Sequence, residues 1–333
     1  MNLIVLLSQS VHMIKIGVFG AGHLGKTHLK LADASQKLDL IGFYDPNPET
    51  VQKVSSTTPY QAFESQEALI KAVDIVDIVT PTLSHFELAK KAIEAKKHVF
   101  IEKPLTHTVA EAHALVDLAE THGVLGQVGH VERFNPAFQA VLSSLTQPKF
   151  IETHRLSEFN PRGTDVSVVL DLMIHDIDIV LSLVDSPIKS IHASGVAVIS
   201  ETPDISNARI AFENGCVANF TASRISLKKM RKSRFFQKNA YIAVDFLTKQ
   251  VEVVKMKDVT GDTKEDLALL LTNAEGKKKQ IYFENPSINN TNPIQEELEH
   301  FAHCIQTQTT PLVSLKNGAR ALEVAHQIIE KIG

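Results

Sequence analysis

The sequence lacks several features that would assign it to a specialised class of protein. Its two cysteines, Cys216 and Cys304, lie far apart and match no metal-binding or redox spacing. This excludes a disulfide scaffold and predicts a reducing, cytoplasmic location. No stretch of about 18 residues is both apolar and free of charge, since the best candidate, Val166–Val184, contains three aspartates and a histidine. We therefore expect no membrane span.

An excess of positive charge is also absent. The chain carries 34 lysines and arginines against 38 aspartates and glutamates, a formal net charge of −4. It shows neither a helix-turn-helix nor a zinc-finger pattern, so no nucleic-acid partner is expected. The 15 histidines include no H-E-x-x-H or equivalent ligand pattern, and we predict no metal site.

The composition is that of a folded protein, and the chain is long enough for two domains. The chain has 333 residues, of which 44% are hydrophobic and 22% charged, close to the average of globular proteins. Residues 1–12 are interpreted as an N-terminal extension, because the apolar run at Leu3–Leu7 lacks the basic flank and cleavage site of a signal peptide. We predict one domain over residues 13–132 and a second over 133–333, with a C-terminal helix that can pack back on the first.

The first predicted domain alternates short apolar runs with amphipathic stretches, which is typical of a parallel sheet wrapped by helices. Helices are expected to start near His23, Pro48, Glu67, Ser84 and Val109. The expected strands are Ile14–Phe19, Leu38–Tyr44, Ile75–Thr80, His98–Ile101 and Leu125–Val128. The fold class predicted for this half is a doubly wound α/β domain.

After Asn135 the pattern changes to one very apolar helix, about Ser167–Leu183, followed by extended segments. The expected strands are Phe150–Arg155, Ile188–Ile199, Ser206–Phe212, Val217–Ser223, Arg234–Asp245, Val251–Met256 and Lys279–Phe283, with hairpin tips near Gly261 and Gly276 and final helices at Pro293–Ile305 and Leu315–Ile332. This order predicts an α+β domain with a large, mostly antiparallel open sheet, covered by helices on one face.

The uncovered face of that sheet is expected to meet a partner subunit. Apolar residues alternate within Ala208–Phe212, Val217–Phe220 and Tyr241–Phe246, and an exposed apolar face of this size is typical of an interface. We therefore predict that the chain forms a homo-oligomer through the C-terminal sheet.

A glycine-rich turn follows the first predicted strand. Gly20, Gly22 and Gly25 form a G-x-G-x-x-G pattern at the start of a helix, which permits a tight turn and the close approach of a pyrophosphate to the helix N-terminus. The predicted cofactor loop comprises Gly20, Ala21, Gly22, His23, Leu24 and Gly25. Asp45 ends the second strand about 20 residues further on, where an acid binds the ribose hydroxyls and repels a 2′-phosphate. NAD is therefore favoured over NADP.

Two further segments carry residue types that a dehydrogenase requires. Lys103 directly follows a strand, at the edge where open α/β sheets bind ligands, although a surface lysine at a strand end is an equally simple interpretation. In the apolar helix, Asp171, His175 and Asp178 share one face. A histidine beside carboxylates suits a general base; the alternative is a core hydrogen-bond network.

Five motifs in order resemble the Gfo/Idh/MocA family of oxidoreductases. They are GAGHLG, TPTLSH, EKP, GHVERFNP and DLMIHDID, and the resemblance extends from Met13 to the C-terminus. It implies an N-terminal Rossmann domain followed by an α/β domain with a large open sheet.

The resemblance also implies roles for individual residues. Lys103 would orient and polarise the substrate hydroxyl, His175 would be the acid/base, and Asp171 would assist. The residues implied to lie along the cofactor are Thr80, Pro81, His85 and Glu102. One departure is Met173, where family members often carry glycine two residues before the histidine, and this changes the space beside the substrate.

Three segments are similar to those of family members that oxidise the 3-hydroxyl of UDP-N-acetylglucosamine: GHVERFNPAF, HRLSEFNPRG with the helix that follows it, and ASRISLKKMRKSRFFQ. The last contains a dense positive cluster, residues 224–234, which suits a diphosphate or, alternatively, a solvated loop or subunit rim. Substrate contacts are expected from Arg133, Arg162, Asp171, His175, Arg224 and Lys229.

The sequence is also compatible with two other functions. The substrate could be a free sugar or an inositol-like cyclitol instead of a nucleotide sugar. A non-catalytic, NAD-binding regulatory protein would keep the glycine turn and Asp45, but it would not need Lys103, Asp171 and His175 together.

Overall fold

The computed structural model describes residues 13–160, 166–259 and 269–333, which form two compact units. The first unit runs to Gly129 and takes in Ile294–Leu315, and the second holds His130–Pro293 and Lys316–Gly333. Arg162 and the hairpin tip expected near Gly261 lie outside the described residues. Within the described ranges, no helix is long and apolar enough to cross a membrane.

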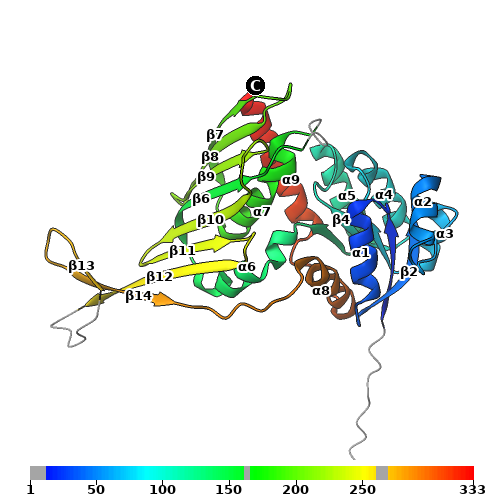
Figure 1. Ribbon diagram of the computed structural model, residues 1–333, viewed down its shortest axis with the longest axis horizontal. Coiled ribbons are helices and arrows are strands. Elements are labelled where there is room, and N and C mark those ends of the chain that lie inside the picture. Colours follow the sequence, from blue (N-terminus) through cyan, green and yellow to red (C-terminus); the bar gives the residue numbers. More distant parts are fainter. Residues whose placement is uncertain (1–12, 161–165, 260–268) are drawn as a thin grey trace, which may run out of the picture. The chain divides into compact units, whose positions relative to one another are not determined.

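The first unit is the doubly wound parallel sheet that the sequence predicts (Figure 1). Its strand order is β2-β1-β3-β4-β5, and every pairing is parallel. The strands are β1 (Ile14–Phe19), β2 (Leu38–Tyr44), β3 (Ile75–Ile78), β4 (His98–Glu102) and β5 (Gly126–Gly129). The winding reverses between β1 and β3, so the loops after these two strands flank the position where such sheets bind ligands.

Local sequence signals explain where the helices of this unit begin. Asn47 caps α2 (Pro48–Ser55) and Ser65 caps α3 (Gln66–Ala72). Thr108 starts α5 (Val109–His122) with a capping box to Glu111. The remaining helices are α1 (His23–Asp33), α4 (His85–Glu94) and, from the end of the chain, α8 (Pro293–Thr307).

Burial on both faces of the sheet holds these elements together. Strand β3 is buried along its whole length, as expected for a central parallel strand. Helix α8 packs Leu298 and Phe301 into the same core cluster as Ile16 and Phe100, so a segment from the end of the chain completes one face of the first sheet (Figure 1).

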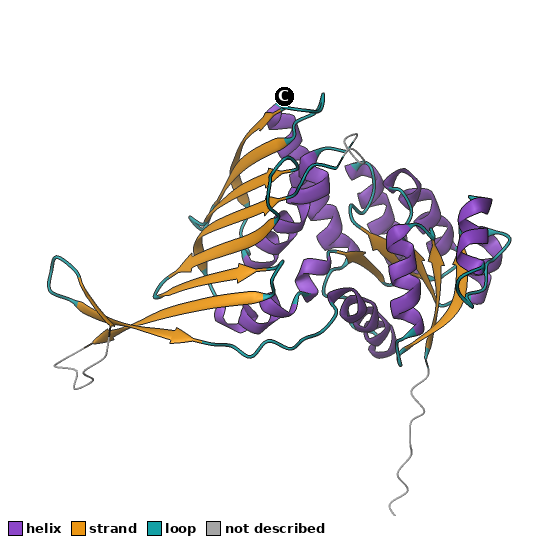
Figure 2. Cartoon of the chain, in the orientation of Figure 1, coloured by secondary structure: helices purple, strands orange, loops and turns teal. Residues whose placement is uncertain are grey.

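In its described residues, the second unit is a nine-stranded sheet with helices on one face (Figure 2). The strand order is β13-β14-β12-β11-β10-β6-β9-β8-β7, and β6–β9 is a parallel pair whereas the other pairs are antiparallel. The strands are β6 (Pro148–Leu156), β7 (Ile188–Val196), β8 (Ile205–Phe212), β9 (Val217–Ser223), β10 (Met230–Gln237), β11 (Ala240–Asp245), β12 (Gln250–Val259), β13 (Leu269–Thr272) and β14 (Lys278–Glu284). The predicted large, mostly antiparallel sheet is confirmed.

The helical layer of the second unit contains α6 (Pro136–Val141), α7 (Ile174–Leu183) and α9 (Leu315–Ile332). Short turns connect these elements: η2 (Val131–Phe134), η3 (Leu142–Ser144) and the π-helical turn η4 (Val169–Met173), which leads directly into α7. The predicted apolar helix is therefore present, but its first turn is wider than an α-helical turn.

The structure of this unit differs in part from the sequence predictions and confirms them in part. The single strand expected over Arg234–Asp245 is a hairpin of β10 and β11, because the chain turns at Asn239 with a positive φ of 63°. Helix α6 and strand β13 were not predicted. The hairpin tip expected at Gly276 is confirmed, with a φ of 77° between β13 and β14.

The prediction that the alternating apolar residues form the uncovered face of the sheet is wrong. Ala208, Ile210 and Phe212 lie on the helix-covered face, in one core cluster with Phe220 and Val244. Because side chains alternate along a strand, the uncovered face carries their neighbours. Among these are polar residues such as Asn207, Arg209, Asn219 and Thr221, and an aromatic group of Phe150, Phe236 and Tyr241.

Candidate active site

The predicted cofactor residues of the first unit lie at one edge of its sheet. The glycine turn follows β1, Asp45 follows β2, Thr80 and Pro81 follow β3, and Lys103 follows β4. The carboxyl ends of parallel strands share an edge, and this sheet reverses its winding there. The structure thus brings these sequence-distant residues together within one unit.

The glycine turn has the shape that a dinucleotide pyrophosphate requires. Gly20 has a φ of 91°, and a Cβ there would lie 2.8 Å from the carbonyl oxygen of Val79. A Cβ on Gly25 would lie 1.8 Å from the Gly20 oxygen, whereas a Cβ on Gly22 would meet nothing within 4 Å. No side chain caps the N-terminus of α1 at Gly22. An uncapped helix N-terminus beside open space fits an anionic pyrophosphate.

Asp45 is held in place by two backbone N–H groups. Its Oδ2 accepts from Ala21 at 2.8 Å and its Oδ1 from Asn47 at 2.9 Å. The side chain is partly exposed, so its remaining lone pairs are available to ribose hydroxyls. This arrangement fits NAD and disfavours a 2′-phosphate, because the carboxylate repels a second anion.

We expect Asp45→Ala to weaken NAD binding by about tenfold or more, because charge-assisted hydrogen bonds to the ribose are lost. The preference for NAD over NADP should fall by a larger factor, since the repulsion of the 2′-phosphate also disappears. Dissociation constants for both cofactors measure this effect. Asp39→Ala, an exposed aspartate on the same strand, is the matched control; an unchanged NAD to NADP ratio in Asp45→Ala would place the ribose contact elsewhere.

His85 and Glu102, both implied to lie along the cofactor, are buried in the wall behind this edge. The Nδ1 of His85 lies 3.0 Å from the carbonyl oxygen of Pro104, and its Nε2 lies 2.9 Å from that of Thr80. Burial lowers the pKa of His85 despite these contacts. The imidazole joins the loop after β3 to the loop that carries Lys103.

A buried histidine that was not predicted from the sequence, His28, contacts the residue before Lys103. The Nδ1 of His28 is 2.9 Å from Asp77 Oδ2, and its Nε2 is 3.2 Å from Glu102 Oε1. Both His28 and Asp77 are fully buried. Asp77 was the available signal, because a carboxylate inside an otherwise apolar buried strand requires a charged or hydrogen-bonding partner.

The second unit presents the predicted polar stripe. Asp171 lies in the π-helical turn η4 and His175 in the first turn of α7, and both side chains are partly exposed. The rings of His175 and the buried His130 meet edge to face, with centroids 6.3 Å apart. Asp178 is buried and lies 3.5 Å from the Arg133 guanidinium. π-Helical turns are frequent at functional sites.

A buried ionic network supports this stripe from beneath. The Arg155 guanidinium on β6 donates to both oxygens of Asp176, at 3.0 and 2.9 Å, and to Glu132 Oε1 at 2.9 Å. Burial opposes the charge of Arg155, but the two carboxylates raise its pKa overall. Asp176 follows His175 directly, so this network sets the orientation of the first turn of α7 against the sheet.

The positive cluster at residues 224–234 does not form one patch. Arg224 is buried and donates to the Val166 carbonyl, while Lys229 is exposed, 3.9 Å from Glu158. Along β10, side chains alternate between faces. Arg231 pairs with Glu132 at 3.6 Å, Lys232 with Asp245 at 3.2 Å and Arg234 with Glu152 at 3.8 Å.

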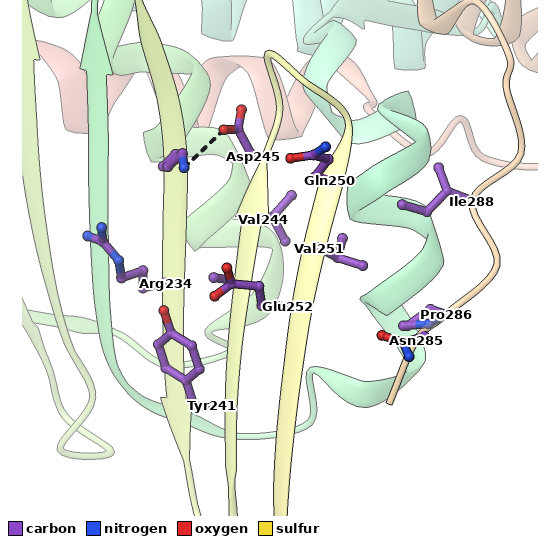
Figure 3. A pocket seen from close by; sticks show the side chains of 12 residues that line it. Arg234, Tyr241, Val244, Asp245, Gln250, Val251, Glu252, Asn285, Pro286 and Ile288 are labelled. Atoms are coloured by element: carbon purple, nitrogen blue, oxygen red, sulfur yellow. Dashed lines mark ion pairs between the residues drawn. The ribbon is translucent and has the colours of Figure 1, made fainter. Parts of the chain in front are cut away.

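A pocket of about 440 Å³ opens between β10, β11 and β12 and the segment that follows β14 (Figure 3). Lys232 and Arg234 line it together with Tyr241, Asp245 and Glu252. Since both cations are paired with carboxylates, the pocket is mixed in charge and does not have the character of a phosphate site. Among the described residues, no group of three or more His, Cys, Asp or Glu side chains is arranged to hold a metal ion.

Comparisons with known proteins match both halves of the chain to one family. Residues 14–130 match the model of an oxidoreductase family with an NAD-binding Rossmann fold, and residues 112–239 match the GFO/IDH/MocA C-terminal domain. The chain is 39% identical over 245 residues to a UDP-N-acetylglucosamine 3-dehydrogenase of Acidithiobacillus ferrooxidans. The aligned region covers 73% of this chain and 77% of the relative.

Two further matches extend over nearly the whole chain. A solved structure of the Acidithiobacillus enzyme superimposes with a TM-score of 0.85 and 31% identity, and covers 96% of this chain and 98% of the other. A scyllo-inositol 2-dehydrogenase (NAD(+)) of Bacillus subtilis is 25% identical and covers 94% of this chain and 92% of the relative. The chain therefore belongs to the Gfo/Idh/MocA family of oxidoreductases, and its first unit is an NAD-binding Rossmann domain.

Proposed function

We propose that this protein is an NAD-dependent dehydrogenase that oxidises the 3-hydroxyl of UDP-N-acetylglucosamine or a closely related nucleotide sugar. The observation that carries the proposal is the similarity to the Acidithiobacillus enzyme, which extends over 96% of the chain and so includes both units. The similarity to the scyllo-inositol enzyme is lower, at 25% identity, and a cyclitol is therefore the second candidate substrate.

The first unit binds the cofactor in this proposal. The N–H groups at the start of α1 and of the glycine turn Gly20–Gly25 bind the pyrophosphate, and Asp45 binds the adenosine ribose. Thr80 and Pro81 line the same edge of the sheet, and His85 and Glu102 support it from within. When bound, NAD accepts the hydride from the sugar carbon.

Two side chains supply the proton chemistry. His175 removes the proton of the substrate hydroxyl as general base. The Lys103 ammonium polarises that hydroxyl and stabilises the negative charge that develops on its oxygen. Asp171 hydrogen-bonds the sugar and assists His175. Lys103 belongs to the first unit and His175 to the second.

The nucleotide end of the substrate requires positive charge. Among the predicted substrate residues that the structure describes, Lys229 has the charge most open to solvent, since its side chain is 57% exposed and its ion pair with Glu158 is long, at 3.9 Å. Arg133 and Arg224 are more enclosed, and we assign them a supporting positive potential near the diphosphate. Arg162 belongs to the same proposed group.

We also propose a cytoplasmic homodimer or homotetramer. Cys216 and Cys304 are both unbridged, which suits a reducing compartment. The uncovered face of the second sheet carries the aromatic group Phe150, Phe236 and Tyr241, and a second copy of the chain would bury these rings.

The proposal is tested by NADH formation with a panel of possible substrates. We expect NADH to form with UDP-N-acetylglucosamine and not with myo-inositol, free glucose or buffer. UDP-glucose, which lacks the acetamido group, should react more slowly. Turnover only with an unphosphorylated polyol would replace the nucleotide sugar by a cyclitol, and binding of NAD without turnover on any compound would favour the non-catalytic alternative.

A further inference from the structure

The buried His28 contacts carboxylates from two different strands. Its Nδ1 faces Asp77 of β3 and its Nε2 faces Glu102 of β4, at 2.9 and 3.2 Å. A neutral imidazole has only one N–H, so both contacts are favourable at once only when the ring is protonated. This geometry therefore favours the protonated ring, which lies between two carboxyl groups.

The surroundings of His28 favour the charged form. Burial alone lowers the pKa of its imidazole, but the Coulombic and hydrogen-bond contacts with Asp77 and Glu102 outweigh burial and raise that pKa well above its ordinary value. The other ring contact of His28 in the described part of the chain is the uncharged Phe100, with centroids 5.9 Å apart. The charge is thus held by a geometry that α1, β3 and β4 build together.

Glu102 contacts both His28 and the backbone of Lys103. Its Oε1 faces His28, and its Oε2 accepts the Lys103 backbone N–H at 3.1 Å. On the neighbouring strand, a Cβ at Gly129 would lie 2.9 Å from the Glu102 carboxylate, so the glycine leaves just enough room for this group. The carboxylate is therefore enclosed by His28, Gly129 and the amide that it orients.

We infer that His28 is a positioning residue for Lys103, acting through Glu102. The inference rests on the proposed role of Lys103 in polarising the substrate hydroxyl. His28 also belongs to α1, whose N-terminus is the proposed pyrophosphate site. The His28 side chain thereby links α1 to the end of β4, directly before Lys103, and fixes the position of α1 relative to that strand.

A purely structural role for His28 makes a different prediction. If the imidazolium only neutralised two buried carboxylates, any uncharged replacement would be equally harmful. Asn and Gln separate the two accounts, because the Asn amide nitrogen occupies roughly the place of Nδ1 and the Gln amide nitrogen roughly that of Nε2. His28→Gln keeps the contact with Glu102, whereas His28→Asn keeps only the contact with Asp77.

The test compares these two variants in the full-length protein. We expect His28→Asn to lower kcat by about tenfold or more, and His28→Gln to stay within about threefold of wild type, with a similar NAD dissociation constant in both. Backbone hydrogen exchange at Lys103, followed by mass spectrometry, should be faster in His28→Asn than in His28→Gln. Leu69→Ala, a fully buried residue of the same unit, is the control for lost stability and should leave both readouts unchanged.

The outcomes separate this inference from the proposed function. Equal kcat and equal Lys103 exchange in the two His28 variants would overturn the inference. Faster Lys103 exchange in His28→Asn, in a protein that turns over none of the sugars tested, would uphold the contact through Glu102 and overturn the catalytic proposal instead. Because hydrogen exchange needs no substrate, the positioning role can be judged on its own.

Discussion

His175→Gln and Lys103→Met should each lower kcat by about 10²–10⁴-fold, the range that removal of a positioned general base or charge-stabilising group produces. Both groups act on the substrate oxygen, one by taking its proton and the other by stabilising the charge that remains. Neither is assigned to the adenosine half of the cofactor, which Asp45 and the glycine turn bind. The NAD dissociation constant should therefore change little in either variant.

Initial rates at saturating NAD measure the first effect, and direct titration with NAD measures the second. Lys53→Met and His113→Gln are matched controls, because both side chains are exposed on helices of the first unit, and they should retain wild-type rates. The double variant should be scarcely slower than the worse single variant, since the two groups serve one step. Retained turnover in both single variants would contradict the mechanism.

Arg155→Met should lower the free energy of unfolding by about 3–5 kcal/mol, the cost of removing one partner from a buried ionic network. The change leaves the buried carboxylate of Asp176 without its paired cation, and it leaves Glu132 with only the longer contact to Arg231, at 3.6 Å. Both are nearly inaccessible to solvent, with side-chain exposures of 3% and 5%. For a unit of this size the melting temperature should fall by roughly 10 °C or more.

Arg234→Met on the neighbouring strand provides the control. Its ion pair with Glu152 is longer, at 3.8 Å, and both side chains are 36% exposed, so its loss should cost no more than about 1 kcal/mol. Thermal melts of the two variants decide the point. Equal melting temperatures would mean that the Arg155 network does not anchor the second unit, and that α7 is held by its apolar contacts alone.

The fold of the first unit could be predicted closely because its signals are local. The strands at Ile14–Phe19 and Leu38–Tyr44 begin and end where apolar runs do, and the glycine turn lies directly after the first of them. The contact of His28 with Asp77 and Glu102 could not be predicted in this way. It joins three elements that are distant in sequence, and only the pairing of β3 and β4 beside α1 brings the side chains together.

In the second unit, one misplaced strand boundary altered the interpretation of the basic cluster. A strand that started at Arg234 would leave residues 224–233 as a loop, in which all the cations of the cluster could lie together. Strand β10 starts at Met230 instead. Because side chains alternate along it, Arg231 pairs with Glu132 on one face and Lys232 lies on the other, uncovered face. The π-helical turn at Asp171 has no such sequence signal, because it depends on how η4 packs on the sheet.

Isotope labelling in the substrate assay tests whether hydride passes from a nucleotide sugar to NAD. UDP-N-acetylglucosamine that carries deuterium at C3 is incubated with the protein and NAD, and the reduced cofactor is analysed by mass spectrometry. We expect singly deuterated NADH and a slower initial rate than with the unlabelled sugar. Reduced cofactor without deuterium, or none at all while inositol is oxidised, would contradict it.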